Sequence, residues 1–196
     1  MPSFKEHDKV AKEQNIGGGG DFFKLEVGDN KVRILTEYEV IGKHYDQVEK
    51  KSHVCIGLKN GCEYCKKLVD RQVKFMLYVL DRRDDKIKLA EFGYSIIKQL
   101  GEMANSEDWA FDPVPDFDIN VRRSGEKLDT SYQVLRSNHK EVITDEQKND
   151  LAELKPVKEI VTRMKEKAGG SANEEEDPNE AVQMDDGEIR VEDVPL

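Results

Sequence analysis

The chain has 196 residues, of which 37% are charged, and its formal net charge is -10 at neutral pH. That length accommodates one ordinary domain with tails, and the absence of a signal peptide or a long apolar run argues against a secreted or membrane protein. All three cysteines lie between residues 55 and 65, so a disulfide framework is excluded and a reducing compartment is expected.

The acidic charge is concentrated near the C-terminal end. Residues 171–196 carry ten acidic groups against Arg190 alone, so the rest of the chain is close to neutral. Within that remainder, residues 42–98 contain 13 Lys and Arg against 8 Asp and Glu. This distribution predicts a mildly basic folded body with a separate acidic segment.

The first half of the chain predicts an arm followed by strands. Residues 1–21 are polar and end in four glycines, which is typical of a flexible N-terminal arm with a linker. An ordered core is expected over 22–140. Within it, residues 31–38 predict a strand, and residues 44–48 and 52–56 predict a hairpin.

The second half predicts further strands, then helices. Residues 73–80 are the most apolar run and predict a central strand, with 86–90 as its partner. Residues 94–104 have the periodicity of a helix, and 117–123 with 131–136 predict another strand pair. Residues 141–168 predict an amphipathic helical segment that restarts at Pro156, and 169–196 a disordered acidic tail.

These elements predict a mainly β fold with added helices, in the α+β class. A small antiparallel sheet with a helix between strand pairs is compatible with a five- to six-stranded barrel of the OB type. A zinc-binding subdomain would occupy residues 44–66, and a helix would follow the barrel.

The cysteines have the spacing of a metal site. Cys62 and Cys65 are separated by two residues and follow Gly61, a pattern typical of structural zinc sites, and Cys55 would be a third ligand. The surrounding segment is polar and rich in turn residues, which argues against free buried thiols. We predict one structural zinc ion, because three cysteines and a histidine suit a redox-inert site.

Two histidines could supply the fourth ligand. His53 lies on the same face of an extended strand as Cys55. If the hairpin turns near residues 49–51, His44 lies across from Cys55 at contact distance. Spacing alone leaves both assignments open.

Basic and aromatic residues alternate in the strand region, which predicts binding of single-stranded nucleic acid. Such proteins combine a positive groove with aromatic rings on which bases stack. The adjacent Arg122 and Arg123 are the sharpest candidates because they could contact successive phosphates, whereas Tyr78 has a core position as its alternative. The candidate DNA-contacting residues are Lys43, Tyr45, Lys50, Lys51, Lys74, Tyr78, Arg82, Arg83, Lys86, Lys88, Arg122, Arg123, Tyr132 and Arg136.

The acidic tail predicts two roles. A polyanion tethered through glycines 169–170 could occupy a basic groove when nucleic acid is absent. Its end, Asp193, Val194, Pro195 and Leu196, places apolar residues after acidic ones. This ending fits capture by a partner with a basic rim and an apolar pocket.

The sequence contains no catalytic constellation. Four ligands would leave the zinc no open coordination position, and the glycine run 17–20 lacks the Lys and Ser or Thr of a phosphate-binding loop. We therefore expect a binding protein and not an enzyme. The alternative function is a zinc-ribbon adaptor that binds proteins through its tail without contacting DNA.

Several segments together carry a family resemblance. They are Gly28-Asp-Asn-Lys-Val-Arg-Ile-Leu35, Gly42-Lys-His-Tyr45, His53-Val-Cys-Ile-Gly-Leu-Lys-Asn-Gly-Cys-Glu-Tyr-Cys65, the apolar strand after them and the helix 94–104. They resemble the single-stranded DNA-binding proteins of tailed bacteriophages, relatives of the T-even phage helix-destabilising protein. The resemblance covers residues 22–139, is strongest at the cysteines, and extends to the acidic tail in kind.

This resemblance implies an OB fold, one structural zinc, and coating of single-stranded DNA during DNA replication, recombination and repair. It also implies a tail that recruits replication and recombination proteins, self-association along DNA, and a place in the cytoplasm of an infected bacterial host. The family's zinc pattern matches His44 better than His53. The chain departs from the family in its shorter loop between Cys55 and Cys62, in Glu63 where proline is frequent, and at 1–16, which lacks a clear cooperativity motif.

Overall fold

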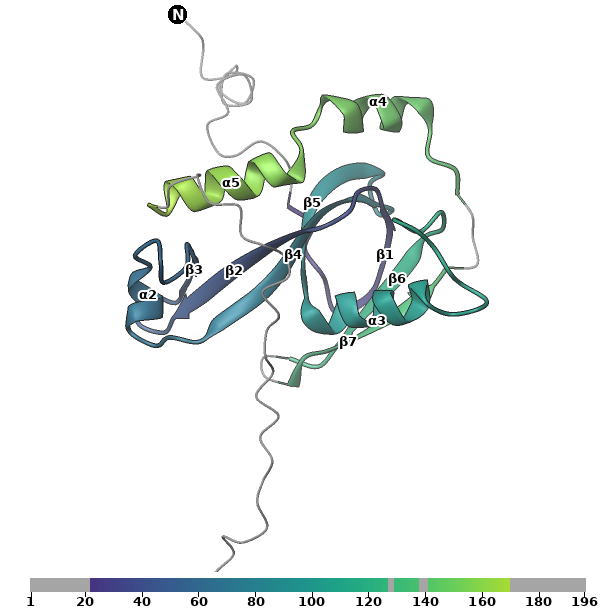
Figure 1. Cartoon of the computed structure of the whole chain (residues 1–196). Helices are drawn as coiled ribbons and strands as arrows, with labels where there is room; N and C mark the ends of the chain where they lie inside the picture. The colour runs from purple at the N-terminus through teal and green to yellow at the C-terminus, as the bar shows by residue number, and fades with distance from the viewer. Residues whose placement is uncertain (1–21, 127–128, 138–140, 170–196) are drawn as a thin grey trace, which may run out of the picture.

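The computed structural model describes residues 22–126, 129–137 and 141–169 (Figure 1). The predicted arm at 1–21 and the acidic tail from residue 170 onward lie outside these ranges. No helix of the described ranges is long and apolar enough to cross a membrane. In chain order the elements are β1 (Gly28–Ile34), β2 (Glu39–Asp46), β3 (Lys51–Val54), α2 (Glu63–Lys66), β4 (Arg71–Asp81), β5 (Lys86–Gly93), α3 (Tyr94–Ala104), β6 (Ile119–Ser124), β7 (Ser131–Arg136), α4 (Asp145–Glu153) and α5 (Val157–Lys167).

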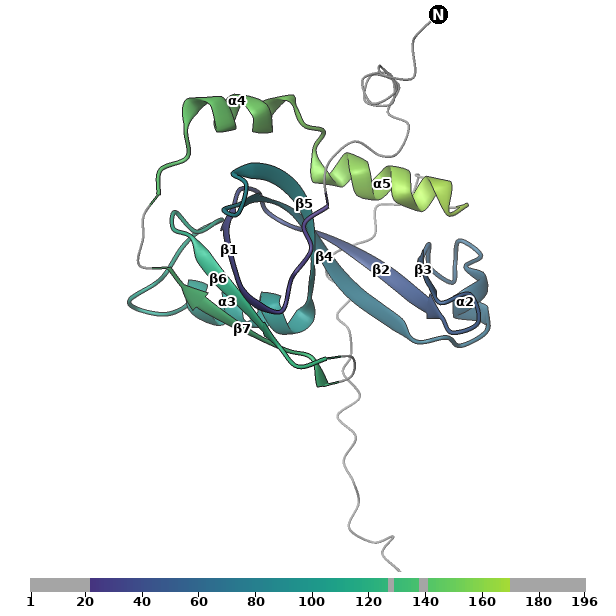
Figure 2. The same ribbon diagram turned by 180° about the vertical axis from the view of Figure 1, so that it is seen from behind.

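The strands form one sheet whose ladders are antiparallel. The main path has the order β3-β2-β4-β1-β6-β7, and β5 pairs with the remaining edge of β4. The sheet curls so that β1, β4, β5 and β6 surround a common interior, with α3 across one side (Figures 1 and 2). The α+β class is confirmed, but within the described residues no ladder joins β7 to β5, so the sheet is open and not the closed barrel that was predicted.

β4 connects the two parts of the sheet. Its first half pairs with β2, and its last residues pair with β1 along the same edge. Beyond the curl, β2, β3 and the beginning of β4 continue outward together with α2 (Figure 2). We call this projection, residues 42–73, the arm; it is distinct from the N-terminal arm predicted at 1–21.

The interior of the curl is a hydrophobic core. Side chains two residues apart on a strand point to the same side, so alternate residues of each strand meet inside, and α3 adds its apolar face. The main buried members are Val32, Ile34, Leu77, Val79, Phe92, Ile96, Leu100, Ile119 and Val121.

The opening between β7 and β5 is covered by α3. Gln99 of this helix accepts a hydrogen bond from the backbone N–H of Val134 (2.8 Å), and its side-chain NH2 donates to the carbonyl of Tyr132 (3.0 Å). The side-chain amide thus occupies backbone groups on β7 that a further strand would otherwise bind.

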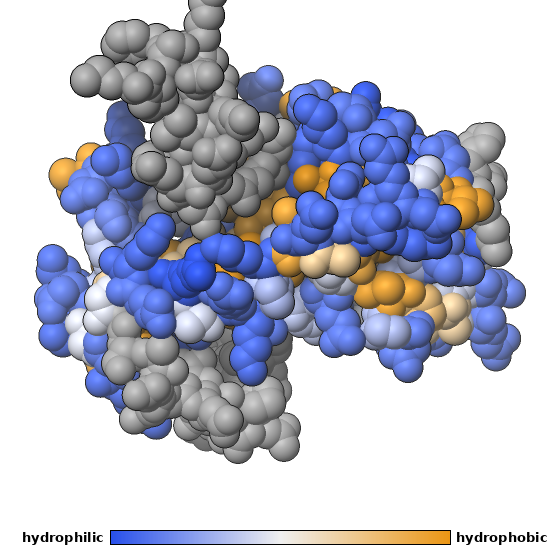
Figure 3. Space-filling model, turned by 90° about the horizontal axis from the view of Figure 1, so that it is seen from above, coloured by the Kyte–Doolittle hydropathy of each residue, from blue (hydrophilic) through white to orange (hydrophobic). Residues whose placement is uncertain are grey.

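A second core lies on the outer face of the sheet, beneath α4 and α5. Ile41, Met76 and Leu89 of the strands are buried there with Val157 and Val161 of α5. The opposite side of the helices faces solvent. Seen from above, this face of the molecule is mostly hydrophilic, with hydrophobic patches in between (Figure 3). The outer face of β2, β4 and β5 is therefore largely enclosed by the C-terminal helices.

The helical segment restarts at Pro156, as predicted. Pro156 is the N-cap of α5, and the preceding helix α4 has a complete capping box. The Thr144 hydroxyl accepts a hydrogen bond from the N–H of Gln147 (3.2 Å), and the Gln147 side chain accepts one from the N–H of Thr144 (3.0 Å). Such a reciprocal cap satisfies two donors at the helix start.

The fully buried Asp118 connects the sheet to the chain segment before α4. Its carboxylate accepts hydrogen bonds from the Nε atoms of Arg33 (2.7 Å) and Arg82 (3.1 Å). Both arginines also donate to the carbonyl oxygen of Glu141. Because a buried charge is tolerated only when it is paired and hydrogen-bonded, this group fixes β1, β4 and β6 relative to one another.

A second buried carboxylate, Asp81, lies at the end of β4. Arg83 and Lys88 each approach one of its oxygens at 2.8 Å. Burial opposes its ionisation, but these hydrogen bonds outweigh burial and lower the pKa of Asp81 to about 2.

We predict that Asp81→Asn lowers the free energy of unfolding by about 2 kcal/mol at neutral pH, the equivalent of the lowered pKa. A carboxyl with a lowered pKa in the folded state stabilises above its unfolded pKa and loses that contribution as pH falls through the folded value. The difference between wild type and variant should therefore shrink from about pH 5 downward. Urea unfolding at several pH values measures it, with the exposed Asp150→Asn as control. A difference that stays constant down to about pH 2 would contradict this role.

Candidate metal centre and basic surface

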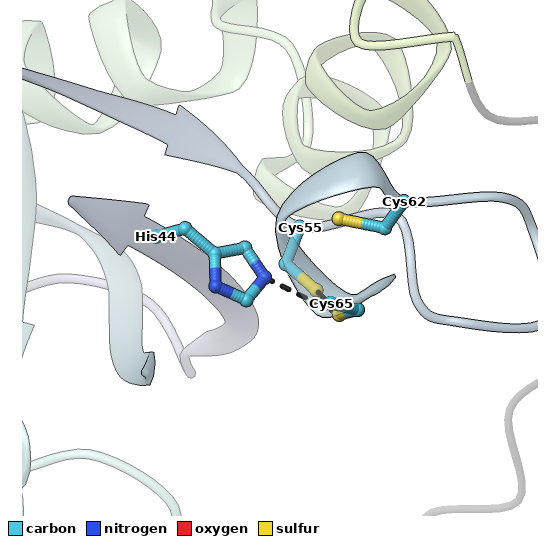
Figure 4. Close-up of side chains that lie close together, drawn as sticks. All are labelled: His44, Cys55, Cys62 and Cys65. Carbon is cyan, nitrogen blue, oxygen red and sulfur yellow. Dashed lines mark hydrogen bonds between the residues drawn. The ribbon is translucent and has the colours of Figure 1, made fainter. Parts of the chain in front are cut away.

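The arm brings His44 and the three cysteines together (Figure 4). His44 lies in β2, Cys55 follows β3 directly, Cys62 precedes α2 and Cys65 lies within it. The ligand atoms of all four side chains lie within 4.8 Å of one another. The cluster could therefore bind one metal ion.

The His44 imidazole is held in the orientation that a metal ligand needs. Its Nε2 atom lies 3.3 Å from the sulfur of Cys65, while Nδ1 faces the carbonyl oxygens of Val69 (2.9 Å) and Asp70 (3.1 Å). Because carbonyl oxygens only accept hydrogen bonds, Nδ1 carries the proton and Nε2 presents its lone pair to the sulfurs. A hydrogen bond of this kind fixes the tautomer of a ligating histidine.

Two glycines shape the loop between the cysteines. Gly57 and Gly61 have φ values of 87° and 81°, a region that favours glycine. The N–H of Cys62 donates to the carbonyl of Gly57 (3.1 Å), and the N–H of Gly57 points to the sulfur of Cys55 (3.4 Å). The loop thus folds back and carries Cys62 toward Cys55.

The cluster is largely buried, with Cys65 partly exposed, and its sulfur atoms are close together. His44, Cys55 and Cys62 are buried, and the sulfurs of Cys55 and Cys65 are 3.4 Å apart. Burial, reinforced by the other two thiols, raises the pKa of Cys65 to about 12. Burial also opposes ionisation of Cys62, but backbone hydrogen bonds at Cys65 and Ile56 outweigh it and lower the pKa of Cys62 to about 7. A bound cation would remove the repulsion that prevents all three sulfurs from being thiolates together.

The other candidate histidine does not join the cysteines. The β2–β3 register places His53 opposite His44, two residues away from the pairing with Cys55 that was expected. The His53 ring stacks on Tyr64, with ring centroids 4.7 Å apart. Between the two alternatives left open by spacing, the fold brings His44 to the cysteines.

Several predicted DNA-contacting cations are engaged inside the protein. Arg82 and Lys88 have side chains only 7% and 13% exposed, and they hold the buried Asp118 and Asp81. Both were predicted to contact DNA. That prediction is corrected, because a DNA phosphate could bind either side chain only by displacing a buried carboxylate. Three other predicted cations have more exposed side chains but also form ion pairs. These are Lys43 with Glu91, Arg83 with Asp81 and Glu26, and Arg122 with Asp29.

The predicted aromatic contacts are also partly taken up by the fold. Tyr78 is only 4% exposed, and its hydroxyl donates to the carbonyl of Lys155 (3.0 Å). It is a core residue that offers no ring face to a base, which corrects its inclusion among the DNA contacts. Tyr132 is half-buried and packs against the inner core.

Two predicted arginines hold neighbouring segments. The Arg136 guanidinium lies over the rings of Trp109 (3.9 Å to the centroid) and Phe117 (4.4 Å). Arg123 donates to the carbonyl of Leu25 (2.9 Å). Both side chains are half-buried, so their cationic groups serve packing at least in part.

The remaining predicted residues do not form one groove. Lys50 and Lys51 are exposed at the turn of the arm, and Lys86 is exposed at the far end of the β4–β5 pair. Tyr45 is exposed on β2, and Lys74 is half-buried on β4. The tail residues Asp193 to Leu196 lie outside the described ranges.

Sequence reasoning missed an exposed aromatic and aliphatic surface where the arm joins the curl. Val40 pairs with Phe75, and Gly42 with Val73, so these side chains share one side of the sheet. The Tyr38 ring meets Phe75 edge-on at 5.2 Å, and Tyr94 follows Gly93, the partner of Lys74. We call this surface, together with the exposed Tyr94 that follows it at the start of α3, the aromatic face: Tyr38, Val40, Val73, Phe75 and Tyr94.

The aromatic face is open to solvent except at Phe75, which is buried beneath Tyr38. Tyr38 and Tyr94 are 50% and 55% exposed, and Val40 and Val73 are 45% and 38% exposed. Tyr45, the β2 aromatic that was predicted, points to the opposite side of its strand because it is an odd number of residues from Val40. The alternation of side chains along β2 is visible in the sequence, but it does not show which side of the strand faces solvent.

Comparisons with protein-family models, with curated proteins and with solved structures found no match. The resemblance to the phage proteins therefore stays a prediction. The metal cluster and the aromatic face are the observations on which a function has to be argued.

We predict that His44→Ala weakens metal binding at the cluster at least about tenfold, whereas His53→Ala leaves it unchanged. His44 supplies the nitrogen ligand, and the His53 ring stacks on Tyr64 without joining the cysteine group. Titration with Co2+ measures both, because thiolate-to-cobalt absorption reports only an ion bound to cysteine. Wild-type affinity in His44→Ala would contradict the assignment.

Proposed function

We propose that this chain is a single-stranded DNA-binding protein of the phage type, which coats and protects single strands during DNA replication, recombination and repair. The observation that carries the proposal is the aromatic face, whose exposed rings could stack on bases. It is built on paired strands and lies beside the arm that carries the cysteine cluster. It acts without catalysis. In the infected bacterial host it would work in the cytoplasm, associate with further copies along the DNA, and recruit replication and recombination proteins through its acidic tail.

The strand order supports an OB-type core within this proposal. β1 lies between β4 and β6, β4 and β5 form a hairpin, α3 follows β5, and β6 and β7 form the second hairpin. A five-stranded OB barrel has the same succession of three strands, a helix and two strands. The opening between β5 and β7, which α3 covers, is the point at which this sheet departs from a closed barrel.

The ligand set supports zinc as the metal. Three thiolates and one imidazole are the donors of structural zinc sites, which are tetrahedral and redox-inert. With all four positions filled by protein, no position remains for a substrate or an activated water. The proposed zinc therefore stabilises the arm and takes no part in a reaction.

Cations flank the aromatic face on the side of the arm. Arg71 pairs with His44 in the β2–β4 register, two residues along from the Gly42–Val73 pair and therefore on the same side of the sheet. The guanidinium of Arg71 lies against Gly42, where a Cβ would collide with its Nε atom. Bases could stack on Tyr38 and Tyr94 while Arg71 contacts the phosphates, which is the usual combination in single-strand binding.

A second function, the protein adaptor, is favoured by a different observation. The turns of the arm expose large apolar side chains: Val48, Leu58 and Leu68 are 93%, 63% and 90% exposed. Leu68 also has a positive φ of 55°, which is rare for a bulky residue. Exposed apolar residues on a projecting arm suit contact with another protein.

We predict that Tyr38→Ala and Tyr94→Ala each weaken binding of poly(dT) about tenfold, since one base–aromatic stack is worth roughly 1–3 kcal/mol. Tyr45→Ala, equally exposed on the other side of β2, should change the affinity less than about twofold, within the usual range for a surface substitution. Fluorescence titration at several salt concentrations measures the affinities, and binding should weaken steeply with salt.

Three outcomes would count against this function. Equal affinity for duplex DNA would contradict single-strand binding, and an absence of DNA binding would favour the adaptor. A larger loss in Tyr45→Ala than in Tyr38→Ala would place the DNA on the opposite side of β2.

We predict that deleting residues 171–196 tightens DNA binding at low salt and abolishes recruitment of partner proteins. The tail carries a net charge of -9 and would compete with phosphates as a tethered polyanion. A titration of the truncated chain beside the full chain measures the first effect. Unchanged affinity at every salt concentration would remove the competitor role.

A further inference from the structure

A second group of metal-binding side chains lies on the β2–β3 hairpin, outside the cysteine cluster. It consists of Asp46, Glu49 and His53, whose potential ligand atoms lie within 4.8 Å of one another. None of the three belongs to the set that surrounds the cysteines. The group combines one imidazole nitrogen with two carboxylates, a donor set that zinc and similar divalent ions accept.

Local structure holds this group in place. The Oδ1 atom of Asp46 accepts hydrogen bonds from the N–H groups of Val48 (2.7 Å) and Glu49 (2.9 Å), which fixes the turn that carries Glu49. The Asp46 carboxylate and the turn that carries Glu49 are therefore held in place before any ion binds.

The His53 ring is fixed by stacking. It lies on the Tyr64 ring at 4.7 Å and 26°, and the other neighbour of Tyr64 is the His44 ring at 5.7 Å. Tyr64 thus contacts both the imidazole of the cysteine cluster and the imidazole of the second group. A ring held in this way loses little further freedom when it binds an ion.

The His53 Nε2 atom has no satisfied hydrogen bond. It is shut off from solvent and lacks a hydrogen-bond partner, although a Glu49 carboxylate oxygen lies 3.3 Å away outside hydrogen-bonding geometry. A buried nitrogen without a partner is costly. When Nε2 is unprotonated, its lone pair is the donor that a cation between the three side chains would use.

We propose that Asp46, Glu49 and His53 bind a second divalent metal ion of the zinc type, separate from the ion of the cysteine cluster. Glu49 and His53 have side chains 53% and 31% exposed, so water completes the coordination and the ion exchanges with solvent. With only three protein ligands, this ion is held more weakly than one bound by three cysteines and a histidine. The site does not depend on DNA binding.

The test uses the full chain with its cysteine cluster already loaded with zinc. Calorimetric titration with ZnCl2 should show one further ion in wild type. His53→Ala and Asp46→Asn should each weaken that binding at least about tenfold, as loss of a ligand does. Glu63→Gln, an exposed acidic residue of the same arm paired with Lys66, is the matched control and should bind like wild type.

A separate readout distinguishes loss of the second metal site from a folding defect. Thiolate-to-cobalt absorption of the cysteine cluster should be the same in all four proteins, and His53→Gln provides a second, more conservative variant. No further ion in wild type up to millimolar free Zn2+ would overturn the proposal. A further ion that binds equally well in His53→Ala, in His53→Gln and in Asp46→Asn would overturn it too.

Discussion

The pairing of β4 with two successive partners along one edge is the constraint on which the rest of the structure depends. β2 binds the first half of this edge and β1 its last residues, while β5 follows the other edge. The arm and the curled sheet therefore share one continuous strand. Tilting the arm would require β4 to bend or its ladders to break, so the distance between the metal cluster and the aromatic face is set by the backbone.

The arm needs a cross-link because it has little interior of its own. Its buried cluster consists of Cys55, Ile56 and Cys62, with Tyr64 and Cys65 partly buried against it. So small an apolar cluster cannot offset the conformational entropy lost when its loops are ordered. A metal ion bound by the cysteine cluster would supply that free energy through its ligand bonds. It would stabilise one end of β4, while the apolar core of the curl stabilises the other.

Local patterns in the sequence predicted the elements that depend on local physics. The apolar run 73–80 became β4, the alternation at 86–90 became β5, and Pro156 began a helix. The cysteine spacing located the metal cluster, because a tight turn and its ligands are encoded within a few residues. These predictions needed no knowledge of how distant segments pair.

Features that depend on long-range pairing were not predictable in this way. The choice of His44 over His53 turned on a hairpin register that differs by two residues from the expected one. Arg82 looked like a free cation because its partner, Asp118, lies 36 residues away in the chain. The aromatic face was missed because only the register of β2 against β4 shows which side of both strands is exposed.

The Gln99 amide has a consequence for how copies of the chain meet. An uncovered strand edge invites backbone pairing with another molecule, and such pairing leads to aggregation. By occupying the N–H of Val134 and the carbonyl of Tyr132, Gln99 blunts the outer edge of β7. If the chain coats DNA as proposed, neighbouring copies would then meet through side chains and not through backbone pairing at this edge.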